Sequence, residues 1–119
     1  MEKTILIDGK QVTFKSTAAT PLRYKRQFGK DFFADIIKLS ALDGLNSKKI
    51  DMKKIDKLDF DVFYNVIWVL AKTADHKIPD PLTWLDGFDE FPLFDIIPEL
   101  QELILSSIKT KKNRKFKWG

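Results

Sequence analysis

The chain contains no cysteine and only one histidine among its 119 residues. Without cysteine there is no disulfide framework, no thiolate metal site and no cysteine nucleophile. The single histidine, His76, lies next to Asp75 with no cysteine anywhere in the chain, which argues against a zinc site or a catalytic triad. The five glycines are scattered singly, so no glycine-rich phosphate loop is present. We therefore expect neither a metal nor a cofactor.

Long apolar runs are absent as well. The longest run, Val66–Ala71, has six residues, far fewer than the ~20 that span a bilayer. The first residues, MEKTILIDGKQ, carry Glu2 and Asp8 and contain too short an apolar run for a signal peptide. We therefore expect a cytoplasmic protein that makes no contact with a membrane.

The charges fall into blocks, although the net charge is only +4. Residues 75–102 hold eight acidic residues against one lysine, whereas residues 103–119 hold six basic residues and no acidic one. Such a layout affects the choice and steering of partners more than the fold. It predicts self-association in which the basic face Arg23–Lys30 of one copy contacts the acidic region 86–102 of another.

Local patterns predict a hairpin at the start of the chain. Two runs, Thr4–Ile7 and Lys10–Lys15, flank Asp8-Gly9, and polar and apolar residues alternate in the second run. Asp-Gly between two such runs is a strong hairpin signal, because both central turn residues need a positive φ. An isolated hairpin is only marginally stable, so this one must pack on helices or pair with another chain.

Helical patterns follow from residue 20 onwards. Thr20-Pro21 is typical of a helix start, with Thr20 as the cap, and Gly29 is typical of a helix end. A second helix is predicted over Asp31–Ala41, and the polar stretch Asp43–Lys57 is predicted to be a connector. The residues expected to face inward in the first helix are Leu22, Tyr24 and Phe28.

The central helix is predicted over Phe60–Thr73, with Asp59 as its cap. Because it is apolar on every side, we expect it to be the spine of the core. Asp80-Pro81 then starts a short helix, and a final helix runs to about Ile108. Pro98 lies inside that last span and predicts a kink or a restart.

These elements predict an α+β fold that is mainly α. Residues 1–16 form a β-hairpin packed on a bundle of about five helices in residues 20–108. Together they make a single globular domain, 1–108, and the basic tail 109–119 is predicted to be disordered.

Aromatic side chains are crowded between residues 84 and 94, among acidic residues. Such side chains either fill a core or form a partner-binding patch, because Trp and Phe bury a large area per residue. No nucleophile or base accompanies the paired carboxylates Asp89 and Glu90, so we expect no enzyme activity. The candidate partner-binding residues are Trp84, Phe88, Phe91, Phe94, Arg23 and Arg26.

Three longer segments follow the hairpin: TPLRYKRQFGKDF at 20–32, FYNVIWVLAKTAD at 63–75 and IPDPLTWLDGFDEFP at 78–92. With the Asp8-Gly9 hairpin, they resemble the tail assembly chaperones of long-tailed bacteriophages and prophages of Gram-positive bacteria. The resemblance covers residues 1 to about 109. It rests on extended strings and on no catalytic signature.

The resemblance implies an accessory protein in the host bacterial cytoplasm that is absent from the mature virion. It would bind the long helical tape measure protein, keep it soluble and help recruit tail tube subunits. The family often makes a longer product by ribosomal frameshifting. Lys111-Lys112-Asn113 can be encoded by a slippery heptamer, and the longer form would be the one that meets tube subunits.

The alternative is a nucleic-acid-binding regulator that uses the helix Arg23–Lys30 and the basic tail, in which Phe116 and Trp118 are interleaved. DNA binding with base preference and a steep salt dependence would favour the regulator. Rescue of an insoluble tape measure protein by co-expression would favour the chaperone.

Overall fold

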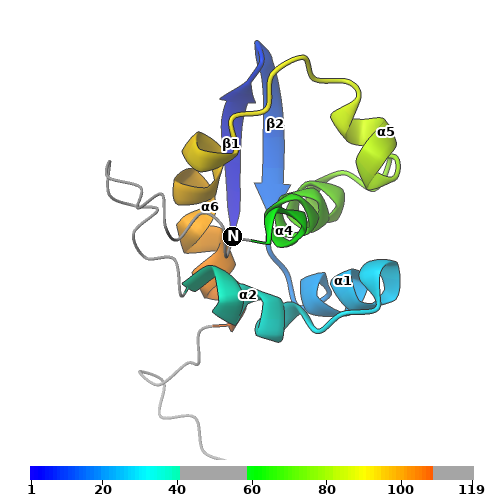
Figure 1. Cartoon of the computed structure of the whole chain (residues 1–119), viewed down its shortest axis with the longest axis vertical. Coiled ribbons are helices and arrows are strands. Elements are labelled where there is room, and N and C mark those ends of the chain that lie inside the picture. Colours follow the sequence, from blue (N-terminus) through cyan, green and yellow to red (C-terminus); the bar gives the residue numbers. More distant parts are fainter. Residues whose placement is uncertain (41–58, 109–119) are drawn as a thin grey trace, which may run out of the picture.

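The computed structural model describes residues 1–40 and 59–108, which form one β-hairpin and five helices. The predicted α+β, mainly α fold with a hairpin on about five helices is confirmed. The connector 43–57 and the tail 109–119 lie outside the described residues. In chain order the elements are β1 (Glu2–Ile7), β2 (Lys10–Lys15), α1 (Thr20–Phe28), α2 (Phe32–Ser40), α4 (Phe60–Ala74), α5 (Pro81–Leu85) and α6 (Leu93–Ile108) (Figure 1).

The hairpin turns at Asp8 and Gly9, as predicted, with φ of 52° and 74°. Strands β1 and β2 pair antiparallel, so that Ile5 lies opposite Val12. One face of the hairpin packs on the helices, because side chains alternate across a strand. The buried residues of this face are Ile5, Ile7 and Phe14.

Helix α4 is the centre of the fold. It contacts β2, α1, α2, α5 and α6, while α6 also contacts β1 (Figure 1). Asp59 caps α4, as predicted, because its carboxylate accepts a hydrogen bond of 3.1 Å from the Asp61 amide. Each fully buried large apolar side chain contributes about 1.5–3 kcal/mol. Nine residues of α4 are buried, so the predicted spine of the core is confirmed.

Helix α1 starts differently from the prediction. Ala19 occupies the cap position, and no side chain caps the helix there. The hydroxyl of Thr20 instead accepts from the Thr17 amide at 3.0 Å and lies 3.2 Å from the hydroxyl of Thr73 in α4. The prediction of Thr20 as the cap is therefore wrong, because tertiary contact with α4 occupies this hydroxyl. Gly29 ends the helix with φ of 69°, as predicted.

The inward face of α1 was predicted only in part. Tyr24 is fully buried and Phe28 packs against the core, but Leu22 is 55% exposed. Tyr24 and Phe28 are four residues apart and share one face, whereas Leu22 is turned away from Tyr24 by about 200°. The prediction for Leu22 is wrong for this reason.

The sequence predicted a kink or a restart at Pro98. Helix α6 runs as one element through Pro98, so the restart is wrong, and the kink stays a prediction. Proline removes a single hydrogen bond from the helix interior, and burial against β1 and α4 holds both halves together. Among residues 1–40 and 59–108, no helix is both long and apolar enough to cross a membrane. The buried stripe of α6 is the predicted one: Leu93, Ile97, Leu100 and Ile104, with Ile96 and Leu103 beside it.

Candidate functional site

Three of the predicted aromatic residues form one cluster, which we call the aromatic triad: Trp84, Phe88 and Phe91. Their ring centroids are 5.2, 5.7 and 5.3 Å apart, and the rings meet edge to face. The ring of Tyr64 in α4 stacks on Phe91 at 6.1 Å. All members of the triad are half-buried. The triad therefore lies at the surface and packs on the core from one side only.

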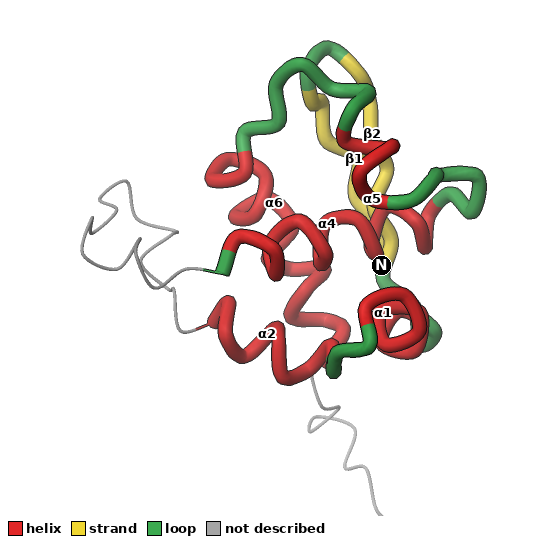
Figure 2. The backbone as a smooth tube through the Cα atoms, turned by 45° about the vertical axis from the view of Figure 1, so that its right-hand side comes forward, coloured by secondary structure: helices red, strands yellow, loops and turns green. Residues whose placement is uncertain are grey.

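The tip of the hairpin holds the segment that carries the triad. Asp8 accepts a hydrogen bond of 2.9 Å from the Asp89 amide, and the ammonium group of Lys10 donates to the carbonyl oxygen of Gly87. The same ammonium lies 5.1 Å from the centroid of the Phe88 ring, a cation–π contact. Figure 2 shows the loop between α5 and α6 passing beside the hairpin tip.

The start of α5 is fixed as well. Asp80 caps the helix, as predicted, by accepting from the Thr83 amide at 3.2 Å and the Thr83 hydroxyl at 2.6 Å. These hydrogen bonds, led by the one from the hydroxyl, lower the pKa of Asp80. The indole Nε1 of Trp68 donates to the carbonyl oxygen of Pro79 at 2.9 Å. The loop before the triad is therefore tied to α4.

Phe94, the fourth predicted aromatic residue, belongs to a different cluster. Its ring centroid lies 6.1 Å from that of Phe60 and 6.4 Å from that of Phe63, both in α4. No ring contact joins Phe94 to the triad in the described part of the chain. Its place near the start of α6 turns it toward the first turn of α4.

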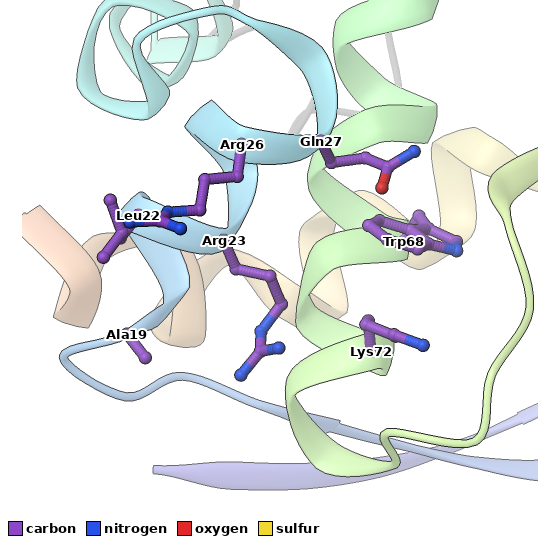
Figure 3. A pocket seen from close by; sticks show the side chains of 7 residues that line it. All are labelled: Ala19, Leu22, Arg23, Arg26, Gln27, Trp68 and Lys72. Carbon is purple, nitrogen blue, oxygen red and sulfur yellow. The ribbon is translucent and has the colours of Figure 1, made fainter.

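Arg23 and Arg26 lie elsewhere again, at a hollow of about 390 Å³ between α1 and α4, which we call the basic pocket. Figure 3 shows Arg23 extending from α1, and Trp68 and Lys72 projecting from α4. The spacing of Trp68 and Lys72 on one helical face is visible in the sequence, but their meeting with α1 is tertiary. The lining residues are Ala19, Leu22, Arg23, Arg26, Gln27, Trp68 and Lys72.

Acidic residues surround the triad and are absent from the basic pocket. Asp86, Asp89 and Glu90 are exposed beside the triad. Within residues 1–40 and 59–108, the ion pair found is Lys38 with Asp35 at 3.5 Å. Within this part of the chain, the acidic residues therefore form no ion pair with Arg23 or Arg26.

The core also contains a polar pair, Tyr24 and Asp35. The Tyr24 hydroxyl donates to the Asp35 carboxylate at 2.6 Å, and both side chains are buried. Burial raises the pKa of Tyr24 well above its ordinary value, and the hydrogen bond to Asp35 raises it further. The pair joins α1 to α2 and opens into no pocket found in the described part of the chain.

The described residues hold no group of three or more acidic or histidine side chains placed to bind a metal ion. The surface they offer is suited to contact: aromatic rings at one place and unpaired cations at another. No family model, curated protein or solved structure matches this chain.

Proposed function

We propose that this chain is a non-enzymatic phage tail assembly chaperone. It binds the tape measure protein, covers its apolar helical stripes and helps recruit tail tube subunits. It acts in the host cytoplasm and is absent from the mature virion. The observation that carries the proposal is the half-exposed aromatic triad Trp84, Phe88 and Phe91, held against the hairpin tip.

The physical argument starts from the partner. A long helical protein exposes apolar stripes before assembly, and unpaired stripes aggregate. Aromatic rings that are already fixed lose little conformational freedom on binding and bury a large area. Weak binding at each site allows displacement by tube subunits, while many copies along one chain supply avidity.

The resemblance noted in the sequence supports the same proposal. The string at 63–75 lies within and just after α4, where Tyr64 supports Phe91. The string at 78–92 includes α5 and the whole triad. The segments that carry the resemblance are therefore the segments that build the candidate surface.

Recruitment of tube subunits falls to a longer product in this proposal. The codons for Lys111-Lys112-Asn113 decide whether the slippery heptamer exists; these residues lie outside the described part of the chain. Synonymous codons that break the heptamer should abolish the longer product, as seen by immunoblot. An unchanged long band would remove this part of the proposal.

Co-expression with a phage tape measure protein tests the main proposal. The wild-type chain should raise the soluble fraction of that protein several-fold, and Phe88→Ala should lose most of the gain. Phe33→Ala is the matched control, because Phe33 is 43% exposed on α2, outside the triad. The soluble fraction is measured by centrifugation and quantitative immunoblot.

Thermal unfolding of both variants checks that each remains folded. Two results would contradict the proposal. A tape measure protein that is equally soluble without the chain removes the chaperone role. Equal losses in folded Phe88→Ala and Phe33→Ala remove the triad as the binding surface.

A further inference from the structure

We propose that the basic pocket between α1 and α4 binds the carboxylate of an aspartate or glutamate side chain on a partner helix. The inference rests on the proposed function, because it takes the partner to be a helical polypeptide. It adds a second contact point, separate from the aromatic triad, and a chemical requirement that the partner must meet.

The pocket gathers cations without a counter-charge. Arg23, Arg26 and Lys72 line it, and no acidic residue of the described ranges 1–40 and 59–108 does. No carboxylate forms an ion pair with these three side chains within residues 1–40 and 59–108. Cations gathered in one hollow focus a positive potential on it. An anion from outside the chain would therefore be attracted into the pocket.

Two of these cations have fixed surroundings of opposite kinds. The Nε atom of Arg23 is buried and has no hydrogen-bond partner among the described residues, and a buried donor left unpaired is costly. The ammonium group of Lys72 donates to the carbonyl oxygens of His76 at 2.7 Å and Ile78 at 2.6 Å. These bonds fix the position of its charge beside the loop that follows α4.

The residues that line the basic pocket favour a side chain over a free ion as the ligand. Ala19 and Leu22 supply apolar surface, with a small edge contribution from Trp68, and the hollow measures about 390 Å³. A water molecule takes up about 30 Å³ in the liquid, so the hollow also admits a ligand much larger than one small oxyanion. The carboxylate of a glutamate would contact the cationic lining residues. Its methylene groups, together with an apolar neighbour on the same helix, would contact the apolar ones.

Nucleic acid fits the pocket less well. Single-stranded nucleic acid binds where bases stack on exposed aromatic faces beside a basic groove. Trp68 is only 3% exposed, and its ring packs edge to face with Phe28 at a centroid distance of 5.6 Å. No ring face is left for a base. By contrast, the planar guanidinium group of arginine can donate two parallel hydrogen bonds to one carboxylate.

The test uses two amphipathic peptides of about 20 residues, a length that permits a helix. They differ only in one central residue of the apolar face, glutamate or glutamine. The glutamate peptide should bind the wild-type chain about tenfold more tightly by calorimetry, because hydrogen bonds to charged groups are the stronger ones. Arg23→Gln should abolish this preference.

Lys25→Gln is the matched control, because it removes one charge from the same helix outside the pocket lining. It should keep the preference. A second measurement needs no variant: the Nε–H resonance of Arg23 in a ¹⁵N–¹H spectrum should shift with the glutamate peptide and stay in place with the glutamine peptide.

Three results would overturn the inference: equal affinity for both peptides, equal loss of preference in Arg23→Gln and Lys25→Gln, or displacement of the glutamate peptide by a single-stranded oligonucleotide. Self-association that is lost in Arg23→Gln and unaffected by the peptides would assign the pocket to a second copy instead. The co-expression assay is separate, so the chaperone proposal can fail or hold independently of the peptide preference.

Discussion

Helix α4 and the segment 80–94 are both rich in aromatic and aliphatic residues, yet they have opposite surroundings. In α4, nine residues between Val62 and Thr73 are buried. In α5, none is buried, and the triad, whose first member Trp84 lies in α5, is half-exposed. Helix α4 lies between the hairpin and the other helices, whereas the loop between α5 and α6 lies against the tip of the hairpin through Gly87 and Asp89.

This difference in burial between two aromatic-rich regions shows that aromatic content alone does not decide burial. A helix that other elements surround turns its apolar residues into core on every side. A short helix at the edge has only one covered side, so its rings remain available to a partner. The first region therefore stabilises the fold, whereas the second leaves aromatic rings partly exposed at the surface.

The largest effect should come from matched leucine truncations in the two regions. Leu70 in α4 is 0% exposed, so Leu70→Ala leaves a cavity and should lower the free energy of unfolding by about 2–5 kcal/mol. Leu82 in α5 is 75% exposed, and Leu82→Ala should change it by less than about 0.5 kcal/mol. Urea unfolding measures both. Similar losses of unfolding free energy in the two variants would contradict the difference between the two regions.

A smaller effect is expected from matched hydroxyl removals. Tyr24→Phe takes the donor away from the buried carboxylate of Asp35 and should cost about 1–3 kcal/mol of unfolding free energy. Tyr64→Phe is the control beside the triad, because no hydrogen bond of the Tyr64 hydroxyl is found among the described residues. It should be close to neutral. Denaturant unfolding at neutral pH decides whether the two differ.

The same pair of variants gives a pH dependence. The pKa of Tyr24 is raised in the folded state, so its neutral phenol stabilises the fold below the unfolded-state pKa of about 10. This contribution is lost as the pH rises above that value. The stability advantage of the wild type over Tyr24→Phe should therefore shrink above about pH 10. A constant gap across that range would contradict the assignment.

The smallest effect should be local to the triad. Lys10→Ala removes the contacts of the hairpin tip with Gly87 and Phe88 and should cost about 0.5–1 kcal/mol. The amide of Asp89 should then exchange its hydrogen faster, while amides of α4 keep their protection. Lys15→Ala, at the other end of β2, is the control. If both variants leave Asp89 exchange unchanged, the tip does not hold the segment.

Features that depend on a few neighbouring residues could be predicted from the sequence. Asp8-Gly9 requires a turn with positive φ, and Gly29 ends α1 in the same region of φ. Asp59 and Asp80 cap helices because each side chain reaches an amide two or three residues further on. The apolar stripe of α6 repeats at helical spacing and is buried accordingly.

The candidate site could be predicted only in part. The sequence identified the aromatic residues and the arginines, but it could not group them, because grouping depends on which elements meet. Phe94 turned out to contact α4 near Phe60, apart from the triad. Leu22 was assigned to the core, but it lines the basic pocket. Local patterns carry no information about such long-range neighbours.

By itself, the sequence determined where helices and strands begin and end in most places, and it determined the crowding of aromatic and acidic residues after residue 80. Those properties arise from turn, cap and periodicity rules that act within a few residues. Only the tertiary structure decided that the hairpin tip meets residues 87–89, which are 77 and 81 positions away along the chain from their partners. Such contacts depend on how all elements share one core, so the triad and the basic pocket exist only in the folded chain.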